Sequence, residues 1–338
     1  MSARLRVGVV GCGVIGRRRA TEAAASPHTE CVAVADPVTR AATETAAAVG
    51  AAATGDWRRV IERPDVEAVV VATPNGHLAE ITIAALSAGK HVLVEKPMGR
   101  SLAEAEQMRA AACAAGRVLK VGFNHRYHPA IAAAWQRVSD GAIGEVINLH
   151  CRYGHGGRPG YEREWRGDRT LAGGGELVDQ GVHVVDLFHW FAGLPQQAFA
   201  ALQTAVWPLG DLEDNAFGVF RFPSGVVGAF HTSWTQWKNL FSLEVYGRSG
   251  AVVVQGLGRS YGVETLTVYR RQPAGGPPEA VTQTFEGADD SWRLEWEDFV
   301  RAVQGGTGML GTADDGVTAM RMIDALYRSA AAGAPVEL

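Results

Sequence analysis

The stretch Leu5-Arg6-Val7-Gly8-Val9-Val10-Gly11-Cys12-Gly13-Val14-Ile15-Gly16 decides the fold. The apolar run over residues 5–10 predicts a buried strand, and it leads directly into the pattern G-x-G-x-x-G. A helix is predicted over residues 17–25, and a second strand over residues 31–35 ends at Asp36, 25 residues after Gly11. Strand, glycine loop, helix, strand and acid in this order are typical of a dinucleotide-binding unit.

The residues of this loop suit a pyrophosphate. Gly11, Gly13 and Gly16 let backbone N–H groups approach it at a helix N-terminus, and Val14 and Ile15 complete the loop. Asp36 can accept both ribose hydroxyls of NAD and would repel the 2′-phosphate of NADP. Arg40 is the opposing observation, because it could reach that phosphate. We therefore expect NAD, with NADP as the weaker alternative and a glycine turn without a ligand as the other.

The alternation of strands and helices continues to Gly122. Strands are predicted over residues 68–72, 92–94 and 118–121, with a helix after each of the first two. The pattern describes a complete dinucleotide-binding domain of about 120 residues, which we place at residues 1–122. The strand over 92–94 runs into Glu95-Lys96-Pro97, and Pro97 cannot continue a ladder. Lys96 is then expected at the carboxyl end of a buried strand, where open α/β sheets bind ligands; the alternative is a lysine at a solvated strand end.

The pattern changes after residue 123, so a second domain is predicted over residues 123–338. Alternating runs predict a large, open, mainly antiparallel sheet in an α+β domain, with strands over 146–153, 197–206, 214–222, 226–234, 242–246, 251–255 and 265–269. Residues 154–172 and 273–278 are expected to be loops. Helices are predicted over residues 129–138, 177–191, 292–304 and 313–331, and the last of them is expected to pack back toward the first domain.

The helix over residues 177–191 carries a possible acid–base pair. Asp179 and His183 are four residues apart and so share one helix face, where the carboxylate could orient the imidazole. One alternative is an ordinary buried histidine. Another is a metal site formed with His189, but no further ligand follows at a persuasive spacing, and no metal is predicted.

Composition limits the class of protein. The chain has 338 residues, 47% hydrophobic and 20% charged, as expected for a globular protein of two domains. A net charge of −4 offers no footprint for nucleic acid, and no apolar run is long enough to span a membrane. The four cysteines are scattered and no export signal opens the chain, so free thiols and a cytoplasmic location are expected.

Five motifs resemble the Gfo/Idh/MocA family (glucose–fructose oxidoreductase, inositol dehydrogenase and relatives) in order along the chain. They are Gly11 to Gly16, Ala72-Thr73-Pro74-Asn75, Gly89-Lys90-His91-Val92 leading into Glu95-Lys96-Pro97, Gly122-Phe123-Asn124-His125-Arg126-Tyr127, and Asp179-Gln180-Gly181-Val182-His183-Val184-Val185-Asp186. The resemblance implies a Rossmann domain with a doubly wound parallel sheet, an open-sheet second domain and a nicotinamide cofactor. It implies Lys96, Asp179 and His183 as the catalytic residues. The implied cofactor-binding residues are Gly11, Gly13, Val14, Ile15, Gly16, Asp36, Thr73, Pro74, Asn75, Glu95, Lys96 and Asn124.

Two further stretches, residues 155–166 and 234–239, resemble sugar-modifying members of amino-sugar and aminoglycoside antibiotic pathways. The substrate-binding residues expected are Arg126, Tyr127, His155, Tyr161, Trp165, Arg166 and Trp234, because aromatic rings stack on sugar CH faces and guanidinium groups bind hydroxyls or phosphates. For the tryptophans, packing on the sheet is the alternative.

The predicted function is NAD-dependent oxidation of a secondary hydroxyl of a sugar, nucleotide sugar or aminoglycoside sugar, with C3 favoured. The alternatives are a reductase of a ketosugar or cyclitol ketone, and a sugar- or NAD-sensing regulator on the same fold. Expected partners are a small sugar substrate and further copies of the chain, with neither nucleic acid nor a membrane. We expect a homodimer or homotetramer that is joined through the open sheet. The candidates for apolar side chains on the outer face of this sheet are Phe217, Val219, Phe230 and Trp234.

Overall fold

The chain divides into two units, and the computed structural model describes residues 4–338. One unit holds the chain up to Phe123 together with Trp292–Val317; the other holds Asn124–Ser291 and Thr318–Leu338. The first change of unit falls after Phe123, the prediction having placed it at 122/123, and residues 292–317 lie with the first unit. The reason lies in α9 (Ser291–Val303), whose Trp296, Phe299 and Val300 pack into the apolar core of the first unit.

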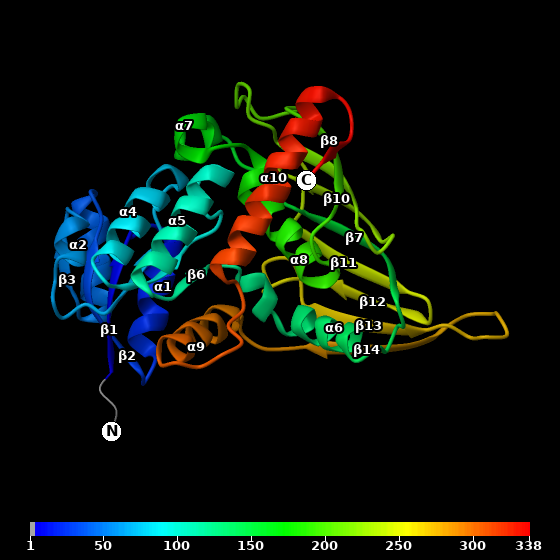
Figure 1. Cartoon of the computed structure of the whole chain (residues 1–338), viewed down its shortest axis with the longest axis horizontal. Coiled ribbons are helices and arrows are strands. Elements are labelled where there is room, and N and C mark those ends of the chain that lie inside the picture. The colour runs from blue at the N-terminus through cyan, green and yellow to red at the C-terminus, as the bar shows by residue number, and fades with distance from the viewer. Residues whose placement is uncertain (1–3) are drawn as a thin grey trace. The chain divides into compact units, whose positions relative to one another are not determined.

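The first unit is built on a six-stranded parallel sheet in the order β3-β2-β1-β4-β5-β6, with helices beside it (Figure 1). This confirms the predicted Rossmann fold. Its strands are β1 (Leu5–Val10), β2 (Thr29–Ala35), β3 (Ala52–Thr54), β4 (Ala68–Val71), β5 (His91–Val94) and β6 (Leu119–Val121). Its helices, besides α9, are α1 (Val14–Ala25), α2 (Thr39–Val49), α3 (Arg58–Ile61), α4 (Asn75–Ser87) and α5 (Leu102–Ala115).

The central strands have continuous apolar sequences because both faces of the sheet are covered. All four residues of β4 and the last three of β5 are buried. Helix α5 begins where predicted, since the Ser101 hydroxyl accepts a hydrogen bond from the Glu104 N–H. Strand β5 pairs in register with β4, from His91 opposite Ala68 to Val94 opposite Val71, and its end delivers Glu95 and Lys96 to the carboxyl edge of the sheet.

The second unit contains a nine-stranded sheet in the order β14-β13-β12-β11-β7-β10-β9-β8-β15. Only the pair β7–β10 is parallel, so the predicted open, mainly antiparallel sheet is confirmed. The strands are β7 (Val146–Gly154), β8 (Gln197–Gln203), β9 (Asn215–Arg221), β10 (Val227–Ser233), β11 (Leu240–Gly247), β12 (Gly250–Gln255), β13 (Glu264–Arg270), β14 (Glu279–Phe285) and β15 (Val336–Glu337). Its helical segments are η1 (Asn124–Tyr127), α6 (Pro129–Ser139), η2 (Tyr161–Arg163), η3 (Trp165–Gly167), α7 (Arg169–Ala172), η4 (Leu177–Gly181), α8 (Val182–Ala192) and the later part of α10 (Ala313–Ala332).

One face of this sheet is covered and the other is open. Side chains on β9 alternate, so Phe217 and Val219 are 45% and 41% exposed on the open face. Phe230 and Trp234, also predicted for that face, are 5% and 1% exposed. The prediction is wrong for these two because Phe230 packs edge-on against Phe188 of α8, on the covered face, and Trp234 is buried against Tyr161.

Several elements differ from their prediction. The predicted loop over 154–172 contains the short helices η2, η3 and α7, and β3 lies where no strand was predicted. The segment predicted as one helix over 177–191 begins with a π-helical turn, η4, before α8. Strand β14 occupies residues left unassigned after the predicted loop 273–278, and it has no apolar alternation because six of its seven residues are exposed. Strand β8 ends at Gln203 instead of residue 206.

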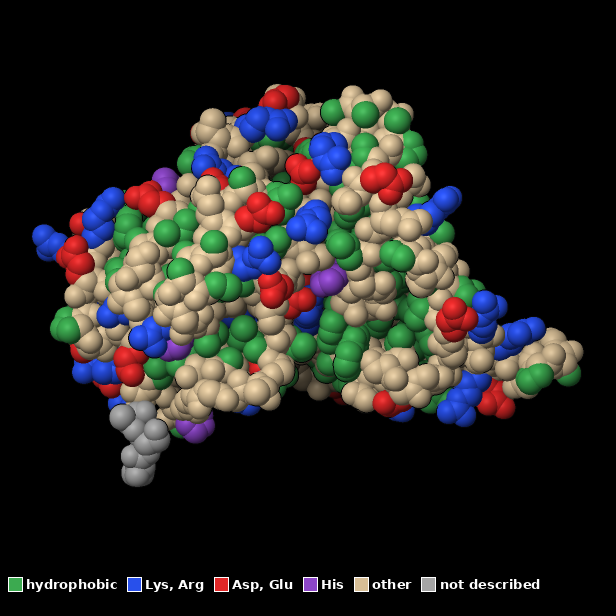
Figure 2. Space-filling model, viewed as in Figure 1, with side chains coloured by type: hydrophobic (Ala, Val, Ile, Leu, Met, Phe, Trp, Pro, Cys, Tyr) green, Lys and Arg blue, Asp and Glu red, His purple; other side chains and the backbone are tan. Residues whose placement is uncertain are grey.

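Charges of both signs are interspersed over the face shown in Figure 2, without a large patch of one sign. All four cysteines are free thiols, as predicted. Among residues 4–338, no helix is both long and apolar enough to cross a membrane. Within the same residues, no three or more His, Cys, Asp or Glu side chains lie close enough together to hold a metal ion.

Candidate active site

The glycine loop of the first unit forms a cradle after β1. Gly11 has φ of +92°, and a Cβ on it would lie 2.4 Å from the Ala72 carbonyl oxygen. A Cβ on Gly16 would lie 1.8 Å from the Gly11 carbonyl oxygen, so the loop and α1 pack directly on each other. Above Gly13 there is open space, and Val14, the first residue of α1, is 87% exposed. The space lies at the N-terminus of a helix, where a pyrophosphate binds favourably. The loop therefore fits a dinucleotide.

Asp36 stands beside this loop, at the end of β2. Its carboxylate accepts hydrogen bonds from the backbone N–H of Cys12 and of Val38, both at 2.8 Å. Arg40, the opposing observation in the sequence, is ion-paired with Glu44 at 2.6 Å. A carboxylate at the end of β2 can accept the ribose hydroxyls of a dinucleotide.

Thr73, Pro74, Asn75 and Lys96 follow two neighbouring strands. β4 pairs with both β1 and β5, with Val71 opposite Val10 and Val94. The segments after these three strands therefore meet at one edge of the sheet. The strand order reverses between β1 and β4, and crevices at such a point are where open α/β sheets bind their ligands.

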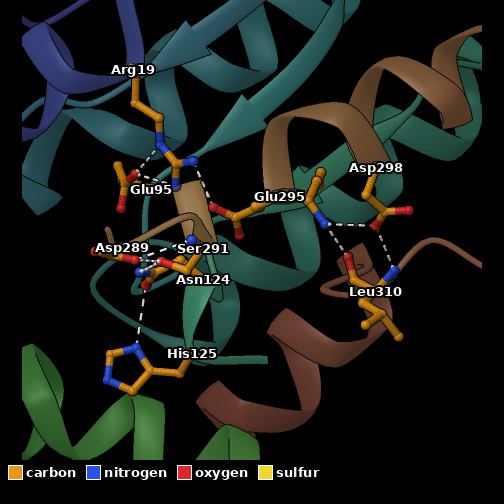
Figure 3. A network of polar contacts seen from close by, with 10 residues as sticks. Arg19, Glu95, Asn124, His125, Asp289, Ser291, Glu295, Asp298 and Leu310 are labelled. Atoms are coloured by element: carbon orange, nitrogen blue, oxygen red, sulfur yellow. Dashed lines mark hydrogen bonds and ion pairs between the residues drawn. The ribbon is translucent and has the colours of Figure 1, made fainter. Parts of the chain in front are cut away.

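Glu95 takes part in a buried ionic network (Figure 3). Its carboxylate accepts from the Arg19 Nε at 2.7 Å, and Arg19 also pairs with Glu295 of α9 at 2.5 Å. Arg19 and Glu295 are fully buried. Further along α9, Asp298 pairs with Lys120, which also donates to the Leu310 carbonyl. Glu95 was predicted to bind the cofactor; in the structure its side chain joins the end of β5 to α1 and, through Arg19, to α9.

In the second unit, the segment carrying Asp179 and His183 is anchored at its N-terminus by Glu213. The Oε1 atom of Glu213 accepts from the N–H groups of Gly175 and Leu177 at 3.0 and 3.1 Å, and from the Tyr327 hydroxyl at 2.7 Å. A Cβ on Gly174 would lie 2.1 Å from the Tyr327 hydroxyl, and one on Gly175 would lie 2.2 Å from the Glu213 carbonyl oxygen. The glycines before the helix therefore allow this anchor to form.

Asp179 lies in the π-helical turn η4 and is bound by an arginine. Its Oδ2 accepts from the Arg166 Nε at 2.9 Å, and Arg166 stacks over the Trp165 ring. His155 lies within reach of this pair, and burial lowers its pKa, as do Arg166 and Arg158, against the opposing effect of Asp179. Asp179, Trp165, Arg166 and His155 thus form one polar cluster.

His183 lies in the first turn of α8 among aromatic side chains. The His125 ring from η1 stacks on it, with centroids 3.7 Å apart and planes 15° apart. Tyr153 of β7 stands edge-on to both rings, at 5.3 Å from His125 and 6.5 Å from His183. The neighbouring Tyr261 hydroxyl accepts from Gln180 at 3.0 Å. The second unit therefore provides an imidazole, a carboxylate and two phenols in one neighbourhood.

Comparison with known proteins agrees with this arrangement. Residues 5–123 match the model of an oxidoreductase family with an NAD-binding Rossmann fold, and residues 131–253 match the GFO/IDH/MocA C-terminal domain. The structure of GenD2 from gentamicin A biosynthesis, in complex with NAD, is 31% identical over 100% of this chain and 97% of that one, with a TM-score of 0.87. The chain belongs to the Gfo/Idh/MocA family of oxidoreductases.

Other members of the Gfo/Idh/MocA family are similar over almost the whole chain. Levoglucosan dehydrogenase of Pseudarthrobacter phenanthrenivorans is 28% identical over 97% of this chain and 96% of its own. Solved with NADH and levoglucosan, levoglucosan dehydrogenase gives a TM-score of 0.89 at 27% identity over 99% of both chains. D-glucoside 3-dehydrogenase of Escherichia coli K12 is 29% identical over 100% of this chain and 98% of its own. Sugar reductases and NADP-dependent dehydrogenases also occur among the relatives. The protein is thus an oxidoreductase of the sugar and cyclitol type.

Within the family pattern, three residues predicted to bind substrate have structural partners instead. Arg126 is 3% exposed and makes two hydrogen bonds to Asp186, at 2.9 and 2.6 Å. Trp234 and Tyr161 pack edge-on to each other in a small apolar core with Leu209 and Leu212. These side chains stabilise the second unit. The others predicted with them, Tyr127, His155, Trp165 and Arg166, are partly exposed.

The sequence gave no individual role to His125, Tyr153, Gln180 or Tyr261. His125 stood inside the family motif at residues 122–127, and Tyr153 ended a predicted strand. Tyr261 lies in the turn before β13, for which no element was predicted. Gln180 stood three residues before His183 in the family motif at residues 179–186. Only tertiary contacts bring His125, Tyr153 and Tyr261 into this neighbourhood, so no local pattern could have selected those three.

Proposed function

We propose that this protein oxidises a secondary hydroxyl of a sugar to the ketone with NAD, C3 being the favoured position. One observation carries the proposal: Lys96 follows β5 at the same sheet edge as the dinucleotide cradle. The names of two relatives, D-glucoside 3-dehydrogenase and levoglucosan dehydrogenase, support the substrate class and, for the first, the position.

Three residues perform the reaction in this proposal. His183 accepts the proton of the reacting hydroxyl, and Lys96 donates a hydrogen bond to the same oxygen as negative charge develops on it. Asp179 orients His183, and Arg166 holds the Asp179 carboxylate from the other side. When bound, NAD supplies a hydride acceptor for the carbinol carbon. Gly11, Gly13, Val14, Ile15, Gly16, Asp36, Thr73, Pro74 and Asn75 would hold the cofactor. Asn124, predicted with them, has its side-chain amide bonded to Ser291 and His125.

The substrate is proposed to be a glycoside or amino sugar. Support comes from the polar cluster around Asp179 and from GenD2, whose source is gentamicin A biosynthesis. The test is NADH formation over a panel of glycosides, nucleotide sugars and aminoglycosides. Oxidation of at least one glycoside or aminoglycoside, with the ketone at C3 by NMR, is expected. The absence of turnover with every member, in both directions, would refute the proposal. Reduction of a ketosugar is the second candidate, because sugar reductases occur among the relatives.

We further propose that two copies of the chain associate through the open face of the second unit's sheet, as a homodimer or as half of a homotetramer. This open face is apolar at Phe199, Phe217 and Val219, each at least 40% exposed. Beside them lies a hollow of about 500 Å³, and its lining includes Asn148, His150, Arg152, His231, Glu244 and Tyr246. Glu244 pairs in register with His150 across β7 and β11. A face carrying apolar side chains, an acid and bases suits a second copy related by a two-fold axis, which places acids opposite bases.

A cytoplasmic location is proposed on the four free thiols, since cytoplasmic proteins keep their cysteines reduced.

A further inference from the structure

The stacked rings of His125 and His183 belong to different elements and are held by different means. His183 is part of α8, while His125 is part of the short 3-10 helix η1. Their ring centroids are 3.7 Å apart, a distance at which two parallel imidazoles are in full van der Waals contact. The ring of His125 therefore limits the orientations open to the ring of His183.

A chain of hydrogen bonds fixes the His125 ring (Figure 3). The Ser291 hydroxyl lies 2.6 Å from Asp289 Oδ1, and the Asn124 Nδ2 lies 3.1 Å from the Ser291 Oγ. Asn124 Oδ1 in turn lies 3.2 Å from His125 Nδ1.

The donor and the acceptor of each hydrogen bond in this chain follow from the Asp289 carboxylate at its end. A carboxylate only accepts, so Ser291 donates to Asp289 and must accept from the Asn124 amide. The Asn124 carbonyl oxygen then accepts from His125, whose Nδ1 carries a proton. The negative charge at the far end of the chain favours an additional proton on His125 over one on His183.

We propose that His125 is a positioning residue for His183: its ring, held by the Asp289–Ser291–Asn124 chain, fixes the plane of the His183 imidazole and keeps that imidazole in its neutral, basic form. This inference rests on the proposed role of His183 as the base. Two positive rings at this distance repel each other, so a proton taken first by His125 disfavours protonation of His183.

Other ionisable groups surround the stack, and most are already paired. Asp179 is bound by Arg166, Asp186 by Arg126, and His128, edge-on to His125, by Glu264. Glu176, Tyr153, His155 and Tyr261 also lie in this neighbourhood, where Tyr153 and Tyr261 hydrogen-bond to each other, and Lys96 would join them in the reacting complex. Burial raises the pKa of Tyr153 well above its usual value, so this phenol stays neutral. Arg166 offsets the charge of Asp179, and Asp289, which also lies 3.9 Å from His128, is the carboxylate whose hydrogen-bonded chain reaches His125.

The test compares three variants by two readouts. His125→Phe keeps a flat ring but no proton site, His125→Ala removes the ring, and Ser291→Ala breaks the chain while leaving both histidines. The first readout is the pH titration of His183 by NMR of protein labelled with 15N-histidine. The second is kcat/KM against pH, with the KM for sugar and the Kd for NAD. His28→Phe, a change at an exposed histidine of the first unit, is the matched control.

In His125→Phe the NMR titration of His183 is expected to move upward by about one pH unit, and the acidic limb of kcat/KM with it. In Ser291→Ala the His183 titration and the acidic limb of kcat/KM are also expected to move upward, but by a smaller amount than in His125→Phe. In His125→Ala, kcat is expected to fall about tenfold or more, while the KM for sugar and the Kd for NAD stay within about twofold of wild type. His125→Phe is expected to restore part of the lost kcat. The same His183 titration in wild type and His125→Phe, or equal kcat in wild type and His125→Ala, would overturn the inference. The NMR result is independent of turnover, so a wild-type protein that oxidises no sugar refutes the proposed function without deciding this inference.

Discussion

At the scale of single residues, Asp36 and Arg126 show that the sequence can predict where a side chain lies without predicting which residue it contacts. The place of Asp36 followed from the end of a strand, because strand pattern and acid are both local signals. That its oxygens accept from Cys12 and Val38 required the fold. Arg126 was expected to bind a sugar, yet its guanidinium donates hydrogen bonds to Asp186, 60 residues later in the chain. Residue type does not reveal such a partner.

The cofactor preference is a prediction at this scale. Wild type is expected to give a higher kcat/KM with NAD than with NADP, because the Asp36 carboxylate repels a 2′-phosphate. Asp36→Ser removes the charge and should narrow the ratio by about tenfold or more. Steady-state rates with both cofactors decide it. Equal or better kcat/KM with NADP in wild type would show that Asp36 does not select the cofactor.

At the scale of elements, the segment 173–192 shows what periodicity predicts and what it misses. The apolar spacing predicted a helix here, and α8 is present. The wider turn η4 and its anchor were not predictable, because the anchor comes from Glu213 and Tyr327, far along the chain. Three glycines, residues 173–175, stand at the start of this segment. In the structure, two of them make room for these side chains. π-Helical turns of this kind often lie at functional sites.

Substitution of Glu213 tests this anchor. Burial raises the pKa of Glu213 above its usual value, so its ionisation costs stability as the pH rises. Glu213→Gln keeps an oxygen acceptor without the charge. Its free energy of unfolding relative to wild type should therefore increase from about pH 4 to about pH 8. Glu213→Ala leaves buried donors unpaired and should cost about 1 to 3 kcal/mol. Urea unfolding across this pH range measures both. A loss of stability in Glu213→Gln that is the same at every pH would contradict the account.

At the scale of the whole molecule, the parallel and the antiparallel sheet were predictable because each has its own periodicity of apolar residues. The unit to which residues 292–317 belong was not predictable. Helix α9 follows the second unit in sequence but packs with the first through Trp296 and through Glu295, the partner of Arg19. The open face of the large sheet was predicted correctly for Phe217 and Val219 but not for Phe230 and Trp234. Strand alternation placed Phe217 and Phe230 on opposite faces only once the register between β9 and β10 was known.

The proposed association through the open face has a direct test. Phe217→Glu with Val219→Glu places two charges on the apolar part of that face and should convert a dimer or tetramer into smaller species at micromolar concentration. Val281→Glu, on β14 at the edge of the sheet, is the control, because Val281 is 69% exposed. Light scattering after size exclusion gives the masses. A monomeric wild type would refute the proposed association.

The dependence of kcat/KM on pH for wild type and Lys96→Ala tests the central claim most directly, with the sugar that the panel identifies. The account predicts a fall in kcat of about a hundredfold or more, an NAD affinity changed far less, and an acidic limb moved to higher pH, because His183 loses a neighbouring positive charge. Lys96→Arg should restore little, since a guanidinium fork cannot replace the ammonium. An unchanged acidic limb in Lys96→Ala, or turnover close to wild type, would contradict the account and leave Lys96 as a charge at the end of β5.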